Sequence, residues 1–274
     1  KGVNVSFLSK NGFTGNLVTN PHEDEFLRYF TGGMLTTCGL RSVGPSSRDQ
    51  NGEFHPLHGR FNAIPAEEVS CVRKSSDIIE ISGVIRETAL FGCSLSLHRK
   101  IIIDAVNSKI SLYDTMVNET AYPEEIMILY HYNFGYPFLQ EGCRVEFEDL
   151  DSVIPRSDEA KKGMNDYMKI SAPEDNYNEQ VFFHLQKGNS DGIASVKVIN
   201  PKLDITATLE YKLDNLPVIA QWKSMRSGDY ALGLEPSNNY IMGRTGEREN
   251  KTIKIIGAYG KLEYFTSLKF SSFH

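Results

Sequence analysis

The sequence predicts an all-β fold, a mostly antiparallel sandwich with few short helices. Short runs that alternate apolar and polar residues recur along most of the 274-residue chain, and Gly, Asn, Asp, Pro and Ser residues separate them. These runs are rich in Val, Ile, Thr, Tyr and Phe, which favour strands. Helical patterns do not intervene between them, as they would in a doubly wound sheet, so an antiparallel sandwich is favoured.

The alternating runs locate the predicted strands. They cover residues 77–86, 95–104, 110–117, 126–134, 181–185, 193–199, 205–211, 218–222, 230–234 and 252–259. Residues 2–8 alternate in the same way, so we expect the chain to begin inside a strand and to lack upstream sequence. The main helical candidate is 157–168, where Ser157 is a capping residue and the interior Gly163 lowers helix propensity. No repeat or long linker divides the chain, and residues 1–274 are predicted to form a single domain.

Composition limits the partners and the cellular compartment. A net charge of -6 without a Lys/Arg block argues against a nucleic-acid partner. No apolar run approaches the ~20 residues needed to span a bilayer, and no signal-peptide pattern is present, so we expect a cytoplasmic protein without a membrane partner. Four well-separated cysteines without a C-x-x-C pair favour free thiols over a disulfide framework, and they are Cys38, Cys71, Cys93 and Cys143.

The predicted strand 126–134 ends in a polar pair. Because alternate side chains of a strand point to opposite faces, Met127, Leu129, His131 and Asn133 share one face, which is apolar and then turns polar at its end. Pro137 soon ends any further pairing. This pattern is typical of a pocket rim, and the alternative for His131 is a buried, hydrogen-bonded core histidine.

A carboxylate occupies the equivalent place in the run 230–234. Ala231, Gly233 and Glu235 share a face, and Pro236 follows at once, so Glu235 lies where the strand stops. Two small residues below a carboxylate leave room for a ligand against the sheet. An ordinary surface glutamate is the alternative. Asn238, at the end of the same segment, is a further candidate for contact with a ligand.

Two other places offer polar groups to a ligand. In a turn-rich loop, Gly59 lets the backbone turn closely between His58 and Arg60, and the forked guanidinium of Arg60 suits vicinal hydroxyls or a carboxylate. Gln221 and Lys223 flank Trp222 and share a strand face, an arrangement found both in sugar sites and on plain surfaces. No metal site is predicted, because His55 and His58 have only Glu53 as a nearby carboxylate.

The motifs resemble a known family. The segments 32–40, 57–60, 131–137 and 233–238 occur in the order seen in the DUF4432 family, a branch of the aldose 1-epimerase (galactose mutarotase-like) superfamily. The resemblance covers nearly the whole chain. It implies a large β-supersandwich with a sugar cleft on a concave sheet, and it implies that the family's N-terminal strands precede Lys1.

The same resemblance implies roles for individual residues. His131 resembles the mutarotase acid, His58 its second sugar-contacting histidine and Glu235 its base. The chain departs from the mutarotase pattern at Tyr132, where a proline is usual, and at Arg60, where a glycine is usual.

The departure at Arg60 leaves two interpretations open. Arg60 selects an anionic sugar, or it pairs with an acidic side chain such as Glu67 or Glu68 and braces the loop.

The residue types fit mutarotation. Opening a sugar ring requires a base for the anomeric proton and an acid for the ring oxygen, and a carboxylate near ~4.3 with an imidazolium near ~6.5 meets this need without a cofactor. We therefore expect an aldose 1-epimerase-like isomerase that binds a small sugar, neutral or anionic, as a monomer or homodimer.

Two alternatives remain open at this point. One is a non-catalytic sugar-binding or regulatory protein on the same fold. The other is another sugar isomerase, lyase or glycosidase. A lyase or glycosidase would use a second carboxylate near Glu235 or a tyrosine base, and Asp229 and Glu247 are the carboxylates near Glu235 in the sequence.

Overall fold

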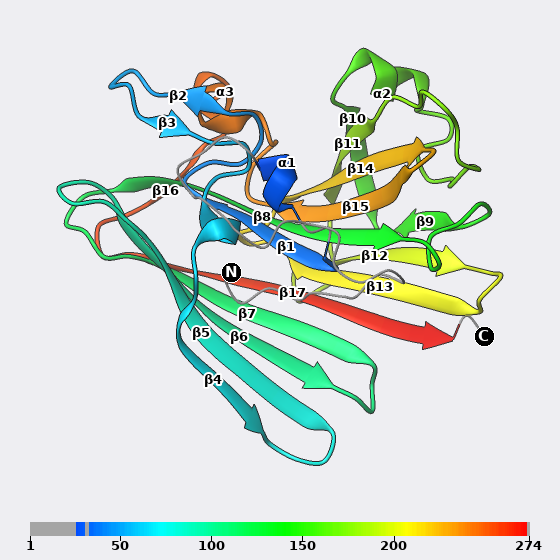
Figure 1. Cartoon of the computed structure of the whole chain (residues 1–274), viewed down its shortest axis with the longest axis horizontal. Helices are drawn as coiled ribbons and strands as arrows, with labels where there is room; N and C mark the ends of the chain where they lie inside the picture. The colour runs from blue at the N-terminus through cyan, green and yellow to red at the C-terminus, as the bar shows by residue number, and fades with distance from the viewer. Residues whose placement is uncertain (1–25, 31–32, 273–274) are drawn as a thin grey trace.

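Two antiparallel sheets form the two layers of the molecule (Figure 1), as predicted for the all-β class. The computed structural model describes residues 26–30 and 33–272. In the first sheet the strands lie in the order β1 (Leu35–Leu40), β8 (Glu124–Gly135), β15 (Asp229–Ser237), β14 (Val218–Arg226), β11 (Gln180–Gln186) and β10 (Leu150–Pro155), and β16 (Lys254–Ile256) also pairs with β8. In this layer β8 lies between β1 and β15, and β15 lies between β8 and β14.

The second sheet has eight strands. Their order is β4 (Glu67–Arg73), β5 (Ile78–Thr88), β6 (Ser94–Asp104), β7 (Lys109–Asn118), β17 (Lys261–Ser272), β13 (Ile205–Lys212), β12 (Ile193–Asn200) and β9 (Arg144–Phe147). The hairpin of β2 (Ser47–Arg48) and β3 (Phe54–His55) and the helices α1 (Phe26–Tyr29) and α3 (Gly243–Glu249) lie beside the first sheet, on the side away from the second (Figure 1).

The main core fills the space between the two sheets. Alternate residues of β8 and β15, including Tyr130, Tyr132 and Leu234, pack there against apolar residues of the second sheet. A buried ion pair lies in this core: Arg99 Nη2 lies 2.6 Å from Asp114 Oδ2. The Tyr130 hydroxyl donates to the same oxygen at 2.7 Å. The hydrogen bond from Tyr130 to Asp114 therefore links the two layers, because Tyr130 belongs to the first sheet and the ion pair to the second.

A second, smaller core covers the opposite face of the first sheet. It contains residues of the other parity in β8, β11 and β14, such as Leu129, Phe183 and Ala220, together with Val43 and Ile241 from the covering loops. Alternate residues on both sides of β8 are therefore buried, one set in each core. This second face carries the candidate site described below.

Several predicted boundaries need correction. The helix predicted at 157–168 is only α2 (Asp158–Lys162); Ser157 caps it as expected, accepting from Ala160 N at 3.2 Å, and Gly163 ends it. Only residues 254–256 of the predicted strand 252–259 pair, because turn residues follow before β17 begins. The strands β1, β2, β3, β4, β9, β10 and β17 were not predicted, and the predicted run 2–8 lies outside the described residues.

Two other expectations can be compared with the structure. The four cysteines are free, as predicted. Within residues 26–30 and 33–272, no helix combines the length and the apolar character needed to cross a membrane.

Candidate functional site

The register of β8 and β15 brings His131 and Glu235 together. Gly233 pairs with Asn133, and Ser237 pairs with Leu129, which places Glu235 opposite His131 between these two pairs. Paired residues of an antiparallel sheet point to the same face. The two side chains meet on the face away from the main core, where His131 Nε2 lies 3.1 Å from Glu235 Oε1.

Small side chains beside Glu235 make this contact possible. A Cβ atom at Gly233 would lie 2.5 Å from Glu235 Oε1 and 3.0 Å from His131 Cε1. Ala220 pairs with Glu235 on the other side. A larger residue at either position would occupy the space in which the carboxyl and imidazole groups meet.

Aromatic rings surround the imidazole of His131. The ring of Trp222 stands edge-on to it with 6.0 Å between centroids, and the ring of Phe30 lies 5.4 Å away. Trp222 is held in place by its indole N–H, which donates to Glu179 Oε2 at 2.7 Å. These rings exclude water from the His131 side of the site.

His58 joins the site from a loop. Its ring centroid lies 6.2 Å from that of His131 and 5.0 Å from that of Phe26. Gly59 fixes this position: its φ is 74°, and a Cβ there would lie 2.5 Å from Gly39 O. The loop is thereby held against β1, with Gly39 N donating to His58 O at 3.1 Å.

Burial keeps this site close to electrical neutrality. Desolvation raises the pKa of Glu235 to about 8; the positive charge of Arg156 opposes this rise and the negative charge of Glu179 adds to it. Desolvation also lowers the pKa of His131 to about 3, with His58 as a smaller cause, and that of His58 to about 4, with Arg156 as a smaller cause. An ionised His131–Glu235 pair would gain attraction at 3.1 Å, yet both groups are fully buried and the neutral forms are favoured.

Polar atoms at the centre of the site remain available for a ligand. Glu235 Oε1 and His131 Nδ1 are buried, and within the described part of the chain neither has a well-aligned hydrogen bond. Buried polar atoms are normally paired, so these two atoms are candidates for contact with a polar ligand.

The two asparagines predicted to bind a ligand lie near the site and bond to the backbone. The amide group of Asn133 donates to Gly33 O at 2.9 Å and to His131 O at 3.1 Å. Asn238 is buried, and its Oδ1 accepts from Ile128 N at 2.8 Å. These bonds position β8. In Asn238 they occupy the side-chain amide, which leaves few hydrogen-bonding groups for a ligand.

The prediction for Gln221 and Lys223 needs correction. Gln221 pairs with Leu234, a residue of the main core, so both side chains point to the face opposite Glu235. There Gln221 Nε2 donates to Tyr167 O at 2.7 Å and Lys223 Nζ donates to Asp166 O at 2.9 Å. Trp222, the residue between them, is the one that faces the site.

Arg60 has partners within the protein. Its guanidinium donates to Phe54 O, and its Nη1 lies 3.6 Å from Glu87 Oε1. The partner is Glu87 rather than Glu67 or Glu68, which instead pair with Arg86. Glu87 is buried and also accepts from Leu40 N at 2.9 Å. This environment matches the interpretation in which Arg60 braces the loop.

Arg156, Glu179 and Phe30 were not singled out from the sequence. Arg156 follows Pro155 at the end of β10, and Glu179 precedes β11. No local pattern marks these residues, since each reaches the site through strand pairing or loop packing. Trp222 carried a signal, because it shares strand parity with Ala220 in the predicted strand 218–222.

An acidic cluster with a histidine lies apart from this site. Ligand atoms of Asp49, Glu53 and His55 lie within 4.8 Å of one another. Arg248 Nη1 approaches Asp49 Oδ1 to 2.6 Å, and Arg41 pairs with Glu53. These guanidinium groups already neutralise the carboxylates, so the cluster is best explained as a link between the β2–β3 hairpin and α3.

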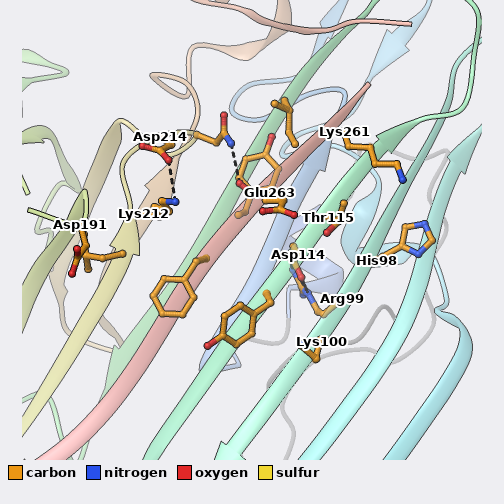
Figure 2. A pocket seen from close by; sticks show the side chains of 16 residues that line it. His98, Arg99, Lys100, Asp114, Thr115, Asp191, Lys212, Asp214, Lys261 and Glu263 are labelled. Atoms are coloured by element: carbon orange, nitrogen blue, oxygen red, sulfur yellow. Dashed lines mark hydrogen bonds and ion pairs between the residues drawn. The ribbon is translucent and has the colours of Figure 1, made fainter. Parts of the chain in front are cut away.

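The second sheet carries a hollow of about 950 Å³ (Figure 2), formed by residues of β6, β7, β13 and β17 and adjoining turns. Two ion pairs belong to its lining: Lys212 Nζ lies 3.1 Å from Asp214 Oδ2, and Arg99 pairs with Asp114. No buried carboxyl–imidazole pair lies in its lining, so the His131–Glu235 face is the better candidate site.

Comparison with known proteins identifies the family and the fold. A family model described as "Domain of unknown function (DUF4432)" matches residues 1–270. No curated protein sequence matches the chain significantly. Among solved structures, a proposed aldose 1-epimerase from Klebsiella pneumoniae is similar, with 26% identity and a TM-score of 0.85, over 94% of this chain and 67% of that one.

More distant structures share the fold. A galactose mutarotase-like protein from Clostridium acetobutylicum has 13% identity and a TM-score of 0.64, over 88% of this chain and 79% of that one. An aldose epimerase homologue from C. elegans has 12% identity and a TM-score of 0.60, over 99% and 92% of the two chains. The galactose mutarotase-like fold expected from the motifs is therefore confirmed.

We predict that Gly233→Ala separates Glu235 from His131 without unfolding the sheet. The added Cβ would lie 2.5 Å from the carboxyl oxygen, so the carboxyl must shift. Imidazole nitrogen NMR signals of His131 should move, while the free energy of unfolding should change by less than about 1 kcal/mol. Gly257→Ala is the control, since its Cβ would meet nothing within 4 Å. Unchanged His131 signals would contradict the described contact.

We predict that Arg60→Ala lowers stability. The change leaves the buried carboxyl of Glu87 without its guanidinium partner, which should cost about 1–3 kcal/mol in urea unfolding. Arg86→Ala is the matched control; this neighbour on β5 pairs with exposed carboxylates, and its loss should cost less than about 1 kcal/mol. Equal stability of both variants would show that the Arg60–Glu87 pair does not brace the loop.

Proposed function

The chain belongs to the DUF4432 family and has a galactose mutarotase-like fold, and from this premise we propose that it is an aldose 1-epimerase-like enzyme that interconverts the anomers of a sugar. The observation that carries the proposal is the buried contact of 3.1 Å between His131 Nε2 and Glu235 Oε1. The similarity to the proposed aldose 1-epimerase from Klebsiella pneumoniae supports the same reaction class.

The pair holds the number of protons that the reaction needs. Ring opening requires one group to accept the anomeric hydroxyl proton and another to donate a proton to the ring oxygen. Besides the N–H of the neutral imidazole, Glu235 and His131 together carry one titratable proton at neutral pH, because burial raises the pKa of the first to about 8 and lowers that of the second to about 3. One donor and one acceptor are therefore present at the same time.

The resting proton lies on Glu235 rather than on His131. In our proposal Glu235 is the base and His131 the acid. Sugar hydroxyls that bond to the carboxyl group would align the 3.1 Å contact, so that the proton passes from Glu235 to His131 Nε2. Glu235 then takes the anomeric proton while His131 protonates the ring oxygen. Rotation about the C1–C2 bond and the reverse transfers close the ring as the other anomer.

Other residues would hold the sugar. His58 faces His131 across 6.2 Å between ring centroids, and its Nδ1 lies 3.4 Å from Gly44 N, the donor of a hydrogen bond to it. The neutral imidazole can therefore donate from its other nitrogen to a sugar hydroxyl. Trp222 supplies an apolar surface for the C–H face of the ring, and Asn133 lies in the row beside Gly233.

Neither carboxylate considered for a lyase or glycosidase approaches Glu235. Asp229 lies at the opposite end of β15, six residues or roughly 20 Å along the strand. Glu247 is fully buried and accepts hydrogen bonds from Tyr240 N and Met242 N. Glu179 lies nearer but is bonded to Trp222. This arrangement favours anomer exchange over hydrolysis by a pair of carboxylates.

We predict that Glu235→Gln and His131→Asn each reduce anomer exchange by at least ~100-fold, since a positioned proton-transfer group contributes ~10²–10⁴ in rate. Glu235→Gln should keep the fold, because it resembles the protonated carboxyl that burial favours. Exchange spectroscopy by NMR on a panel of aldoses and ketoses measures the rate, and Asp229→Asn, at the far end of the same strand, is the control. Retained exchange in a folded Glu235→Gln variant would place the base elsewhere. Sugar binding without exchange in the wild type would favour a non-catalytic protein.

We predict a broad pH plateau for kcat/KM. Unperturbed groups would place the limits near ~4.3 and ~6.5, and the structure corrects this expectation, because burial moves the limits outward to about 3 and about 8. As pH rises through about 8, Glu235 loses the titratable proton of the pair and kcat/KM should fall. With the uncatalysed rate subtracted, a decline already complete by pH 7 would contradict the described site, as would an alkaline decline that persists in Glu235→Gln.

A further inference from the structure

Arg156 lies on the same face of the first sheet as the proposed catalytic pair. Its backbone N–H donates to Val181 O at 2.9 Å, continuing the register in which Pro155 pairs with Phe182. Val181 pairs with Trp222, and Trp222 pairs with Gly233. Arg156, Val181, Trp222 and Gly233 therefore lie side by side on neighbouring strands, with Arg156 at the edge next to β10. Glu235 lies two residues beyond Gly233 on the same face.

The guanidinium of Arg156 is free to meet a ligand. The side chain is exposed, and within residues 26–30 and 33–272 the structure gives it no hydrogen bond or ion pair. Its charge nonetheless acts on both His58 and Glu235, lowering the pKa of each. The guanidinium therefore lies within electrostatic reach of two groups that line the site from different elements.

Three other arginines among the described residues already contact carboxylates. Arg60 contacts Glu87, Arg41 contacts Glu53, and Arg248 contacts Asp49. For Arg60, selection of an anion was one of the two interpretations that the sequence left open. Glu179 is the negative group on the same side, and it is held by the indole N–H of Trp222.

Trp222 lies between Arg156 and Glu235 in the sheet. Three strand spacings separate the backbones of Arg156 and Glu235, or about 14 Å across the sheet. Val181 and Trp222 occupy the two strands between them. A sugar ring laid over Trp222 would therefore have Glu235 on one side and Arg156 on the other.

From this arrangement we infer that Arg156 determines substrate specificity, by binding the carboxylate, sulfonate or phosphate of an anionic sugar whose anomeric carbon lies at His131 and Glu235. A guanidinium binds such groups through two parallel N–H donors, which is stronger than a bond to a neutral hydroxyl. The inference rests on the proposed function for the position of the anomeric carbon, and it names the substrate class for that site.

The test compares matched sugars on the full chain. Glucose and galactose are compared with glucuronate, galacturonate and the two 6-phosphates, with binding measured by ligand-observed NMR titration and anomer exchange by exchange spectroscopy. The wild type should prefer the anionic member of at least one pair by roughly 10- to 100-fold, the range expected for a charged hydrogen bond. In Arg156→Met the ratio should fall to about 1, and Arg156→Lys should restore part of it.

Two further variants sharpen the result. Glu179→Gln removes the opposing charge while keeping an acceptor for Trp222, and it should increase the preference for anions. Arg73→Met removes an exposed arginine from β4 of the other sheet and should leave the preference unchanged. Added salt should weaken the preference in the wild type.

Three outcomes would overturn the inference. They are equal treatment of neutral and anionic sugars by the wild type, an unchanged ratio in Arg156→Met, and loss of the ratio in a folded Arg60→Met variant while Arg156→Met retains it. The proposed function is judged separately. Exchange of neutral sugars without anion preference would uphold the function and reject the role of Arg156, whereas anion-selective binding without exchange would do the reverse.

Discussion

The alternation of side chains along β8 and β15 is the constraint on which the site depends. Tyr130, Tyr132 and Leu234 enter the core between the sheets, so His131 and Glu235 must point to the other face. A shift of the register by one residue would place the imidazole and the carboxyl in the main core. The packing that stabilises the sandwich thereby also fixes the geometry of the proposed acid–base pair.

Burial on the second face determines the chemistry available to that pair. Loops and aromatic rings cover the sheet there, so desolvation raises the pKa of Glu235 and lowers that of His131. The resulting neutral pair carries one titratable proton and avoids the cost of two buried charges. Its central oxygen and nitrogen atoms lack well-aligned partners within the described part of the chain, which is a cost that a polar ligand would remove.

The arginines of this side of the molecule divide into two kinds. Arg60 neutralises Glu87 of β5, and Arg41 and Arg248 neutralise carboxylates of the loop between β2 and β3, as Arg99 neutralises Asp114 in the main core. Arg156 does not share this role, because it is exposed on the edge strand β10 and acts on the site through its charge. An arginine beside a buried carboxylate stabilises the fold. An exposed arginine without a carboxylate partner, such as Arg156, is available to bind a ligand.

The sequence by itself determined the fold class, most of the central strands and the faces of His131 and Glu235, because a period of two residues is a local property of a strand. It also marked the turn at His58 through Gly59. It did not reveal β1, β10 or β17. The sequence analysis placed Gln221 and Lys223 at the site, whereas Trp222 is the residue that faces it. Alternation separates the two faces of a strand but does not tell which face carries the site. Only the tertiary structure decided that Arg60 pairs with Glu87 and that Arg156 and Glu179 act on Glu235, because those relations join residues far apart in the chain through strand pairing and burial.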